Sequence, residues 1–130
     1  VDLNSNYLDW GVRNFELNRI PHQKHLFERA DCLRWLRGSR GRFDRILLNP
    51  PSYSRSKSMA GDFDVTRDYP ALIQDAASRL AAGGVLYFVT HARGFKLDPA
   101  LLPGLVVKDI HGATVPKDFE RSPHHAFRIL

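Results

Sequence analysis

The chain is poor in cysteine, in long apolar runs and in metal-ligand patterns. A single cysteine, Cys32, among 130 residues excludes an internal disulfide and favours a reducing cytoplasm. No apolar run approaches the roughly 20 residues of a membrane helix, and no basic-then-apolar segment opens the chain as in a signal peptide. The six histidines have no metal-ligand spacing with cysteines or carboxylates. We therefore expect a cytoplasmic protein without a membrane partner or a metal.

Acidic residues are also fewer than basic ones. The 14 Asp and Glu residues are outnumbered by 19 Lys and Arg, which gives a net charge of +5 and an isoelectric point near 9.7. Lys and Arg release counterions when they contact phosphates, so this balance favours a polyanionic partner. The length allows one domain with a core of its own, and we expect residues 1–130 to form a single domain.

Apolar spacing and capping residues predict helices that alternate with strands. The first residues resemble the end of a strand. A long polar loop is expected over residues 50–66, and loops of this length inside a compact domain are usually functional. This alternation predicts an open, mostly parallel α/β sheet, whose last two strands form an antiparallel C-terminal edge. The expected helices are 5–18, 32–36, one from Arg67 or Asp68 to Gly83-Gly84 with Pro70 in its first turn, and 97–102; the expected strands are 24–30, 43–49, 85–90, 105–111 and 126–130.

The segment Asn49-Pro50-Pro51-Ser52 follows the buried strand predicted over residues 43–49. Two consecutive prolines remove two backbone donors and fix φ near −65°, so the strand cannot continue through them. The residue before a proline is held extended, which places Asn49 at a stiff strand end. Ligands bind at the carboxyl ends of strands in open α/β sheets. The amide of Asn49 and the nearby carbonyls there suit a planar substrate that carries an N–H or a ring nitrogen.

Two carboxylates are expected at neighbouring strand ends. Asp2 stands where the second strand of a dinucleotide-type fold places the residue that accepts from the cofactor ribose. Asp31 follows the next expected strand, where it caps the helix over residues 32–36 or accepts from an adenine amino group. The order Asp2, Asp31, Asn49 favours a joint ligand-binding interpretation over separate capping roles.

This pattern resembles the class I S-adenosylmethionine-dependent methyltransferases, which have a Rossmann-like sheet. More closely, the chain is similar to the guanine-N7 half of the bacterial bifunctional 23S ribosomal RNA methyltransferases. Several motifs carry that likeness in order along nearly the whole chain: Asp2-Leu3-Asn4, Tyr7-Leu8-Asp9-Trp10, Arg13-Asn14, Leu17-Asn18, Ala30-Asp31-Cys32-Leu33-Arg34-Trp35-Leu36, Asn49-Pro50-Pro51-Ser52-Tyr53-Ser54-Arg55-Ser56-Lys57-Ser58-Met59, Phe63-Asp64-Val65-Thr66-Arg67-Asp68 and Arg93-Gly94-Phe95-Lys96-Leu97.

The resemblance implies S-adenosylmethionine as cofactor and 23S ribosomal RNA, or a precursor of the large ribosomal subunit, as partner. It implies that Asp2 binds the ribose and Asp31 the adenine amino group. The implied cofactor-binding residues are Asp2, Leu3, Asp31, Cys32 and Asn49, with Leu33 also against the adenine. The implied catalytic strand end consists of Asn49, Pro50, Pro51 and Ser52.

Two departures from the family pattern bear on the acceptor atom. The family half usually has Asp where this chain has Asn49, and Thr-Phe where it has Ser52-Tyr53. Asn-Pro-Pro followed by a residue and an aromatic is closer to methyltransferases that act on exocyclic amino groups. The expected acceptor is therefore guanine N7, with N2 as the alternative.

A third departure is the missing glycine loop. In this superfamily the loop lies ~20 residues before the ribose-binding acid, and here only Val1 precedes Asp2. We therefore expect a truncated catalytic domain without the N-terminal glycine-loop strand, an upstream domain in the same parent polypeptide, and weak or no cofactor binding by these residues alone.

Aromatic and basic residues after the strand ends are candidates for RNA contact. Tyr53 can stack on a base or pack over the loop, and the basic side chains can contact phosphates. Cys32 stands where no cysteine nucleophile is expected, so we interpret it as a small apolar residue. Two alternatives remain: a non-catalytic RNA-binding remnant, and an amino-group methyltransferase for another substrate. The candidate RNA-binding residues are Tyr53, Arg55, Lys57, Arg93 and Lys96, with Arg67 as a further basic residue.

Overall fold

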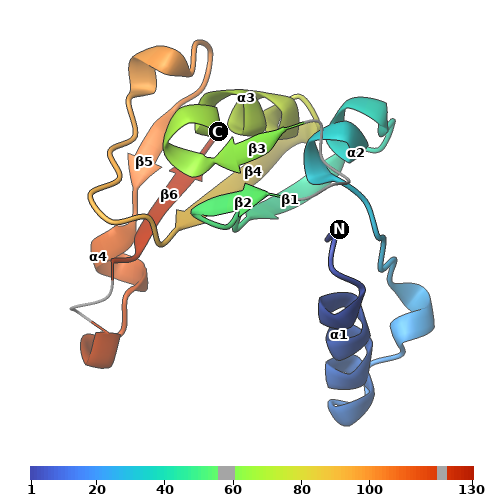
Figure 1. Ribbon diagram of the computed structural model, residues 1–130. Coiled ribbons are helices and arrows are strands. Elements are labelled where there is room, and N and C mark those ends of the chain that lie inside the picture. The colour runs from blue at the N-terminus through green and yellow to red at the C-terminus, as the bar shows by residue number, and fades with distance from the viewer. Residues whose placement is uncertain (56–60, 120–122) are drawn as a thin grey trace. The chain divides into compact units, whose positions relative to one another are not determined.

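The computed structural model describes residues 1–55, 61–119 and 123–130 (Figure 1). By its internal contacts the chain divides into two compact units, unit 1 (Val1–Ser39) and unit 2 (Arg40–Leu130). Each unit has its own elements and its own packing. The expected single domain over residues 1–130 stays a prediction.

Unit 1 contains two α-helices whose starts follow local capping chemistry. Helix α1 (Ser5–Leu17) begins after Asn4, whose side chain accepts a hydrogen bond from the backbone N–H of Asn6 at 3.0 Å. Helix α2 (Cys32–Gly38) begins after Asp31, whose carboxylate accepts from the backbone N–H of Arg34 at 3.0 Å. Such side-chain oxygens satisfy backbone donors that the first turn leaves unpaired. Both helix starts confirm the sequence predictions.

The strand expected over residues 24–30 is wrong for most of its length. Lys24 ends a short 3₁₀ helix, η1 (His22–Lys24), and the residues after it form no named strand. Only Arg29 pairs, in a parallel bridge with Asp2. The Asp2 N–H donates to the Glu28 carbonyl, and the Ala30 N–H donates to the Asp2 carbonyl, each at 3.1 Å. The η1 turn after Pro21 takes up Lys24, the first residue of the predicted strand, and the backbone pairing that remains has minimal length.

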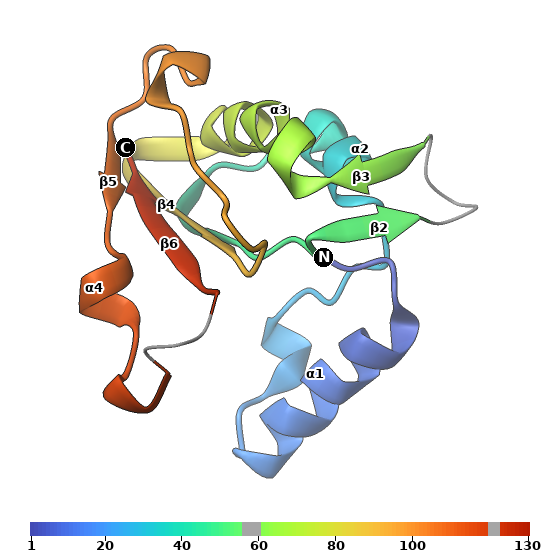
Figure 2. The ribbon, with the colours of Figure 1, turned by 60° about the vertical axis from the view of Figure 1, so that its left-hand side comes forward.

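Unit 2 is built on a four-stranded sheet in the order β1-β4-β6-β5 (Figure 2). Strand β1 (Phe43–Leu48) runs parallel to β4 (Leu80–Thr90), and β6 (His125–Ile129) is antiparallel to both β4 and β5 (Val107–Asp109). The α/β fold and the closing antiparallel strand pair are confirmed. The connections carry η2 (Pro99–Leu101), where the short helix over residues 97–102 was expected, α4 (His111–Thr114) and η3 (Lys117–Phe119).

Helix α3 (Val65–Ala77) packs on this sheet through one apolar face. Leu72, Ile73 and Ala76 are buried, as the apolar spacing predicts. Phe88 of β4 is fully buried and lies against three aromatic rings, with centroid separations between 5.7 and 6.4 Å. Burial of several aromatic side chains together dominates core stability. We call these four residues the aromatic cluster: Tyr69, Phe88, Phe95 and Phe127.

Helix α3 begins earlier than the predicted start at Arg67 or Asp68. Asp64 caps it, accepting from the Thr66 N–H at 2.8 Å, while the Asp68 carboxylate accepts from the Asp64 N–H at 2.9 Å. This reciprocal pair resembles a capping box and fixes the start of the helix. Pro70 therefore lies inside the helix rather than in its first turn, where its missing N–H removes one intrahelical hydrogen bond.

The Gly83-Gly84 pair does not end α3 as predicted but lies inside β4. The helix ends at Ala77, and the pairing of β1 with β4 shifts register between Phe43 and Arg45. Gly83 has φ +73°, and a Cβ at Gly84 would lie 3.0 Å from the Phe43 carbonyl oxygen. The two glycines are thus required by an irregular strand that approaches its neighbour closely.

Strand β1 is less buried than its near-continuous apolar sequence predicts. Leu48 is buried, but Leu47 is 67% exposed. Asp44 and Arg45 are exposed as well. Strand β1 stands at the end of the sheet order, and β4 is its single sheet neighbour in the described chain. An edge position explains the exposure that a parallel strand paired on both sides would not have.

The long loop predicted over residues 50–66 contains a β-hairpin instead. Strands β2 (Tyr53–Arg55) and β3 (Asp62–Asp64) are antiparallel, with Arg55 opposite Asp62 and Ser54 opposite Phe63. Phe63 is buried and anchors the hairpin. The Ser52 carbonyl accepts from the Val65 N–H at 3.0 Å, so both ends of the hairpin are fixed next to α3.

Candidate functional site

Unit 1 brings its two predicted carboxylates to one end of a parallel backbone pairing. The bridge between Asp2 and Arg29 runs the segments before Leu3 and before Asp31 side by side. The Arg29 side chain ties them further by donating from Nε to the Leu3 carbonyl at 3.2 Å. Asp2, Leu3 and Asp31 are each half-buried. The structure therefore places Asp2 and Asp31, the residues predicted to bind the ribose and the adenine, in the same small part of unit 1.

Each carboxylate uses one oxygen to hold its own turn. Oδ1 of Asp2 accepts from the Asn4 N–H at 2.7 Å, and Oδ1 of Asp31 accepts from the Arg34 N–H at 3.0 Å. These bonds orient the carboxylates without consuming both oxygens. The capping role and a ligand role for Asp31 are therefore compatible.

Cys32 lies next to these carboxylates with a thiol that resists ionisation. Burial raises the pKa of the Cys32 thiol, and the carboxylates of Asp31 and Asp2 raise it further. A neutral thiol is a poor nucleophile and behaves as a small apolar group. This environment supports the apolar interpretation of Cys32.

The end of β1 positions residues 49–52 between two fixed points. Strand β1 stops at Leu48, as the prolines predict, and Ser52 is bound through its carbonyl to the start of α3. Asn49, Pro51 and Ser52 are exposed, and Pro50 is half-buried. The Asn49 amide thus stands on an exposed, conformationally restricted segment whose two ends are held by β1 and α3.

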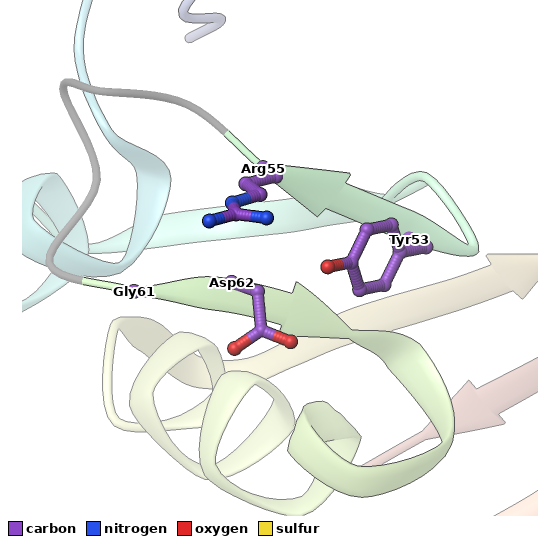
Figure 3. A pocket seen from close by; sticks show the side chains of 4 residues that line it. All are labelled: Tyr53, Arg55, Gly61 and Asp62. Carbon is purple, nitrogen blue, oxygen red and sulfur yellow. The ribbon is translucent and has the colours of Figure 1, made fainter.

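A pocket of about 350 Å³ lies at the hairpin and is lined by Tyr53, Arg55, Gly61 and Asp62 (Figure 3). Tyr53 and Arg55 come from β2, and Asp62 comes from β3. The pocket brings together two of the residues predicted to bind RNA. The sequence did not predict Asp62 as a site residue. Its place opposite Arg55 depends on a hairpin, and the polar sequence of this segment does not predict a hairpin.

Arg67, the further basic residue, is paired with the carboxylates of Asp68 and Asp62. Its guanidinium donates to both oxygens of Asp68 at 2.8 Å, and Nη1 lies 3.6 Å from Oδ2 of Asp62. The bond from Arg67 lowers the pKa of Asp68, and the Thr66 hydroxyl and N–H lower the pKa of Asp64. At neutral pH this network is ionised and fixes β3 to the first turn of α3.

Arg93 and Lys96 are exposed after the end of β4. Between them Phe95 is buried in the aromatic cluster, and its N–H donates to the Ala92 carbonyl at 3.3 Å. The anchored aromatic side chain fixes the backbone from which both basic side chains project. Lys57, the remaining predicted RNA-binding residue, lies outside the described residues.

Metal and membrane features are lacking in the part of the chain that the structure describes. Across residues 1–55, 61–119 and 123–130, no group of three or more His, Cys, Asp or Glu side chains is placed to hold a metal ion. Within these same ranges no helix combines the length and apolar character needed to cross a bilayer.

Comparison with known proteins gives matches over the whole chain. The ribosomal RNA large subunit methyltransferases K/L of Methylococcus capsulatus and Legionella pneumophila are each 45% identical over 100% of the chain. That of Stutzerimonas stutzeri is 44% identical over 99%. The chain spans only 18%, 19% and 18% of these three relatives, respectively. No protein-family profile matches the chain.

Two solved structures share the fold. A putative methyltransferase crystallised with SAH has a TM-score of 0.71 at 19% identity and covers 98% of the chain, which in turn covers 37% of it. A putative S-adenosylmethionine-dependent methyltransferase from Streptococcus mutans has a TM-score of 0.72 at 18% identity, covers 98% of the chain and is itself covered to 36%. The Rossmann-like methyltransferase fold expected from the sequence is thereby confirmed. The chain is related over its whole length to one part of the ribosomal RNA large subunit methyltransferase K/L family.

Proposed function

We propose that the chain takes part in transferring a methyl group from S-adenosylmethionine to guanine N7 in 23S ribosomal RNA. The observation that carries this proposal is the placement of Asp2 and Asp31 together, in a chain matched from end to end by ribosomal RNA methyltransferases. The full activity, the RNA substrate and the cofactor are carried over from relatives of which the chain spans about a fifth.

The residues of unit 1 fit the nucleoside part of that cofactor. Ribose hydroxyls and an adenine amino group are hydrogen-bond donors, and Asp2 and Asp31 present oriented acceptors. The neutral thiol of Cys32 gives an apolar surface beside them. When bound, the cofactor supplies an electrophilic methyl group carried on a sulfonium.

The residues of unit 2 fit the methyl acceptor. The Asn49 amide and the Pro50 carbonyl stand on the segment held by β1 and α3, so they can orient a base without a large entropy cost. Guanine N7 has a free lone pair and needs no general base. An exocyclic N2 acceptor would instead require the Asn49 amide to stabilise a developing positive charge.

The basic residues of unit 2 fit an RNA partner. Arg93 and Lys96 are exposed beside an anchored aromatic residue, and the chain carries a net charge of +5. Phosphate contacts of this kind position an RNA without specifying its sequence. A base inside a duplex is shielded, so the target guanine must leave its stack before methylation.

The test is methyl transfer by the complete polypeptide that carries these residues. Labelled S-adenosylmethionine and 23S ribosomal RNA from a strain lacking the gene are the substrates, and mass spectrometry maps the modified base. We expect one N7-methylguanine. We expect Asn49→Ala to lower the single-turnover rate roughly a hundredfold, because it removes an orienting group at the reaction centre. Asp44→Asn, on exposed β1 surface, is the matched control and keeps the rate.

Three results would contradict the proposal. Methylation of a base other than guanine would remove the substrate assignment, and methylation at N2 would remove the N7 assignment. An unchanged single-turnover rate in Asn49→Ala would remove Asn49 from the site.

A further inference from the structure

The hairpin register places three chemically distinct side chains on one face. In an antiparallel pair alternate residues share a face, so Tyr53 and Arg55 of β2 lie on the face of their partners Asp64 and Asp62. Ser54 and Phe63 occupy the other face, where Phe63 is buried. The pocket of about 350 Å³ thus has an aromatic ring, a guanidinium and a carboxylate at its walls (Figure 3). Its volume is within the range of small-ligand pockets, roughly 300–1,000 Å³.

Arg67 interacts with both the backbone and the carboxylate of Asp62. Arg67 donates from Nη2 to the Asp62 carbonyl at 3.0 Å, and its Nη1 lies 3.6 Å from Oδ2. Arg67 is itself fixed by the two 2.8 Å bonds to Asp68. A residue that is positioned through a second residue in this way can supply geometry as well as charge.

Among the four RNA bases, guanine matches this set of groups. Its Watson–Crick edge carries the O6 acceptor and then two adjacent donors, N1–H and the N2 amino group. A carboxylate can accept from both donors at once, and a guanidinium can donate to O6. Adenine and cytosine offer a carboxylate one amino group, and uracil offers one N–H between two acceptors that repel it. An aromatic ring stacks on any base.

We propose that this pocket binds the guanine that is to be methylated, with Asp62 as the residue that determines base specificity. Asp62 accepts from N1–H and the N2 amino group, Arg55 donates to O6, and Tyr53 stacks on the ring. This inference rests on the proposed function and names the residues by which it selects its base. Because the N2 amino group is bound to Asp62 while N7 lies on the opposite edge, the arrangement also favours N7 as the acceptor.

The test compares guanosine with inosine at the mapped position of an RNA fragment. Inosine keeps N7, O6 and N1–H but lacks the N2 amino group, so it removes one hydrogen bond to Asp62. We expect the complete wild-type polypeptide to methylate the guanosine RNA roughly tenfold to a hundredfold faster under subsaturating conditions, as loss of a bond to a charged group predicts. In Asp62→Ala both rates fall, because inosine also loses its N1–H bond to the carboxylate, and the preference for guanosine falls to near one.

The inosine RNA also separates specificity from damage to the fold. The wild-type comparison needs no variant, and a wild-type protein that does not distinguish the two RNAs would overturn the proposal. So would an Asp62→Ala protein that is folded by circular dichroism and keeps the preference for guanosine. Asp62→Asn keeps the side-chain shape and is expected to lose the preference as well. Asp44→Asn keeps it. Methylation of a base other than guanine by the wild-type protein would refute the proposed function itself. Methylation of guanine with the same preference over inosine in wild-type and Asp62 variants would refute this inference alone.

Discussion

Unit 1 and unit 2 fix their polar groups in different ways. In unit 1 a single side chain, that of Leu36, is buried, and the carboxylates of Asp2 and Asp31 are oriented by backbone N–H groups two and three residues away. In unit 2 the aromatic cluster and α3 form a packed core, and the exposed residues stand on segments anchored to it.

The difference shows two sources of order. Local hydrogen bonds orient a side chain relative to its own turn, but each contributes only about 1 kcal/mol to stability. A ligand that binds several of these side chains together therefore stabilises the folded state of unit 1 further. A packed core holds distant segments together whether or not a ligand is present. Substitutions should therefore act mainly on stability in unit 2 and mainly on ligand affinity in unit 1.

The largest effect is expected from the core of unit 2. Phe88→Ala should lower the free energy of unfolding by roughly 3–5 kcal/mol, since it leaves a cavity in the aromatic cluster. Phe15→Ala, in a half-buried contact with His25 and Phe27, should cost about 1 kcal/mol. Urea unfolding followed by circular dichroism measures both variants.

Fluorescence sharpens this comparison because both tryptophans, Trp10 and Trp35, lie in unit 1. A transition seen by fluorescence reports unit 1, whereas circular dichroism reports both units. Equal destabilisation by Phe88→Ala and Phe15→Ala would show that the two units do not differ in packing as described.

A smaller effect is expected on cofactor affinity. Asp2→Asn keeps the oxygen that accepts from the Asn4 N–H but removes the charge, so the turn should remain. Loss of a charged acceptor for the ribose should weaken S-adenosylmethionine binding by the complete polypeptide roughly tenfold to a hundredfold. Calorimetric titration measures it, with Asp9→Asn on exposed α1 surface as the control. Unchanged affinity in Asp2→Asn would exclude Asp2 from the cofactor site.

The smallest effect is expected from pH, and it should fall on unit 2. Burial lowers the pKa of His124, and the neighbouring His91, His111 and His125 lower it further. The folded state therefore binds a proton at His124 less readily than the unfolded state, so stability should decrease as pH falls below about 6.5. Thermal unfolding followed by circular dichroism measures this step, and His124→Gln should remove it. A profile that is flat from pH 7 to 5 would contradict it.

A second step should follow at lower pH. The pKa values of Asp64 and Asp68 are lowered in the folded state, the first by Thr66 and the second by Arg67. Their stabilising contribution is complete above about pH 4 and is lost as pH falls further, because protonation removes the acceptors that fix the start of α3. The same thermal profile, extended to pH 2, measures this loss.

Local chemistry made much of the fold predictable. Asn4 and Asp31 predict helix starts because a capping side chain bonds to a backbone N–H within three residues. Pro50 predicts the end of β1 for an equally local reason. The parallel placement of Asp2 and Asp31 follows from the order of strands in this class of fold.

Longer-range pairing was not predictable from the same sequence. The polar residues around Tyr53 and Asp62 pair because Phe63 is buried and Ser52 bonds to Val65, and no periodicity announces this. Gly83 and Gly84 have the composition of a helix stop, yet an irregular strand requires them. The place of Asp62 in the pocket therefore depends on its register with Arg55, which local sequence does not predict.

The edge position of β1 has a practical consequence for handling the protein. A strand at the end of a sheet that carries an exposed apolar side chain, here Leu47, is a template on which other chains can add strands. Concentration is then an experimental variable for these 130 residues, because self-association along such an edge would compete with ligand binding. Light scattering across a dilution series is therefore the control for each titration. Leu47→Lys would place a charge on that edge and reduce its self-association.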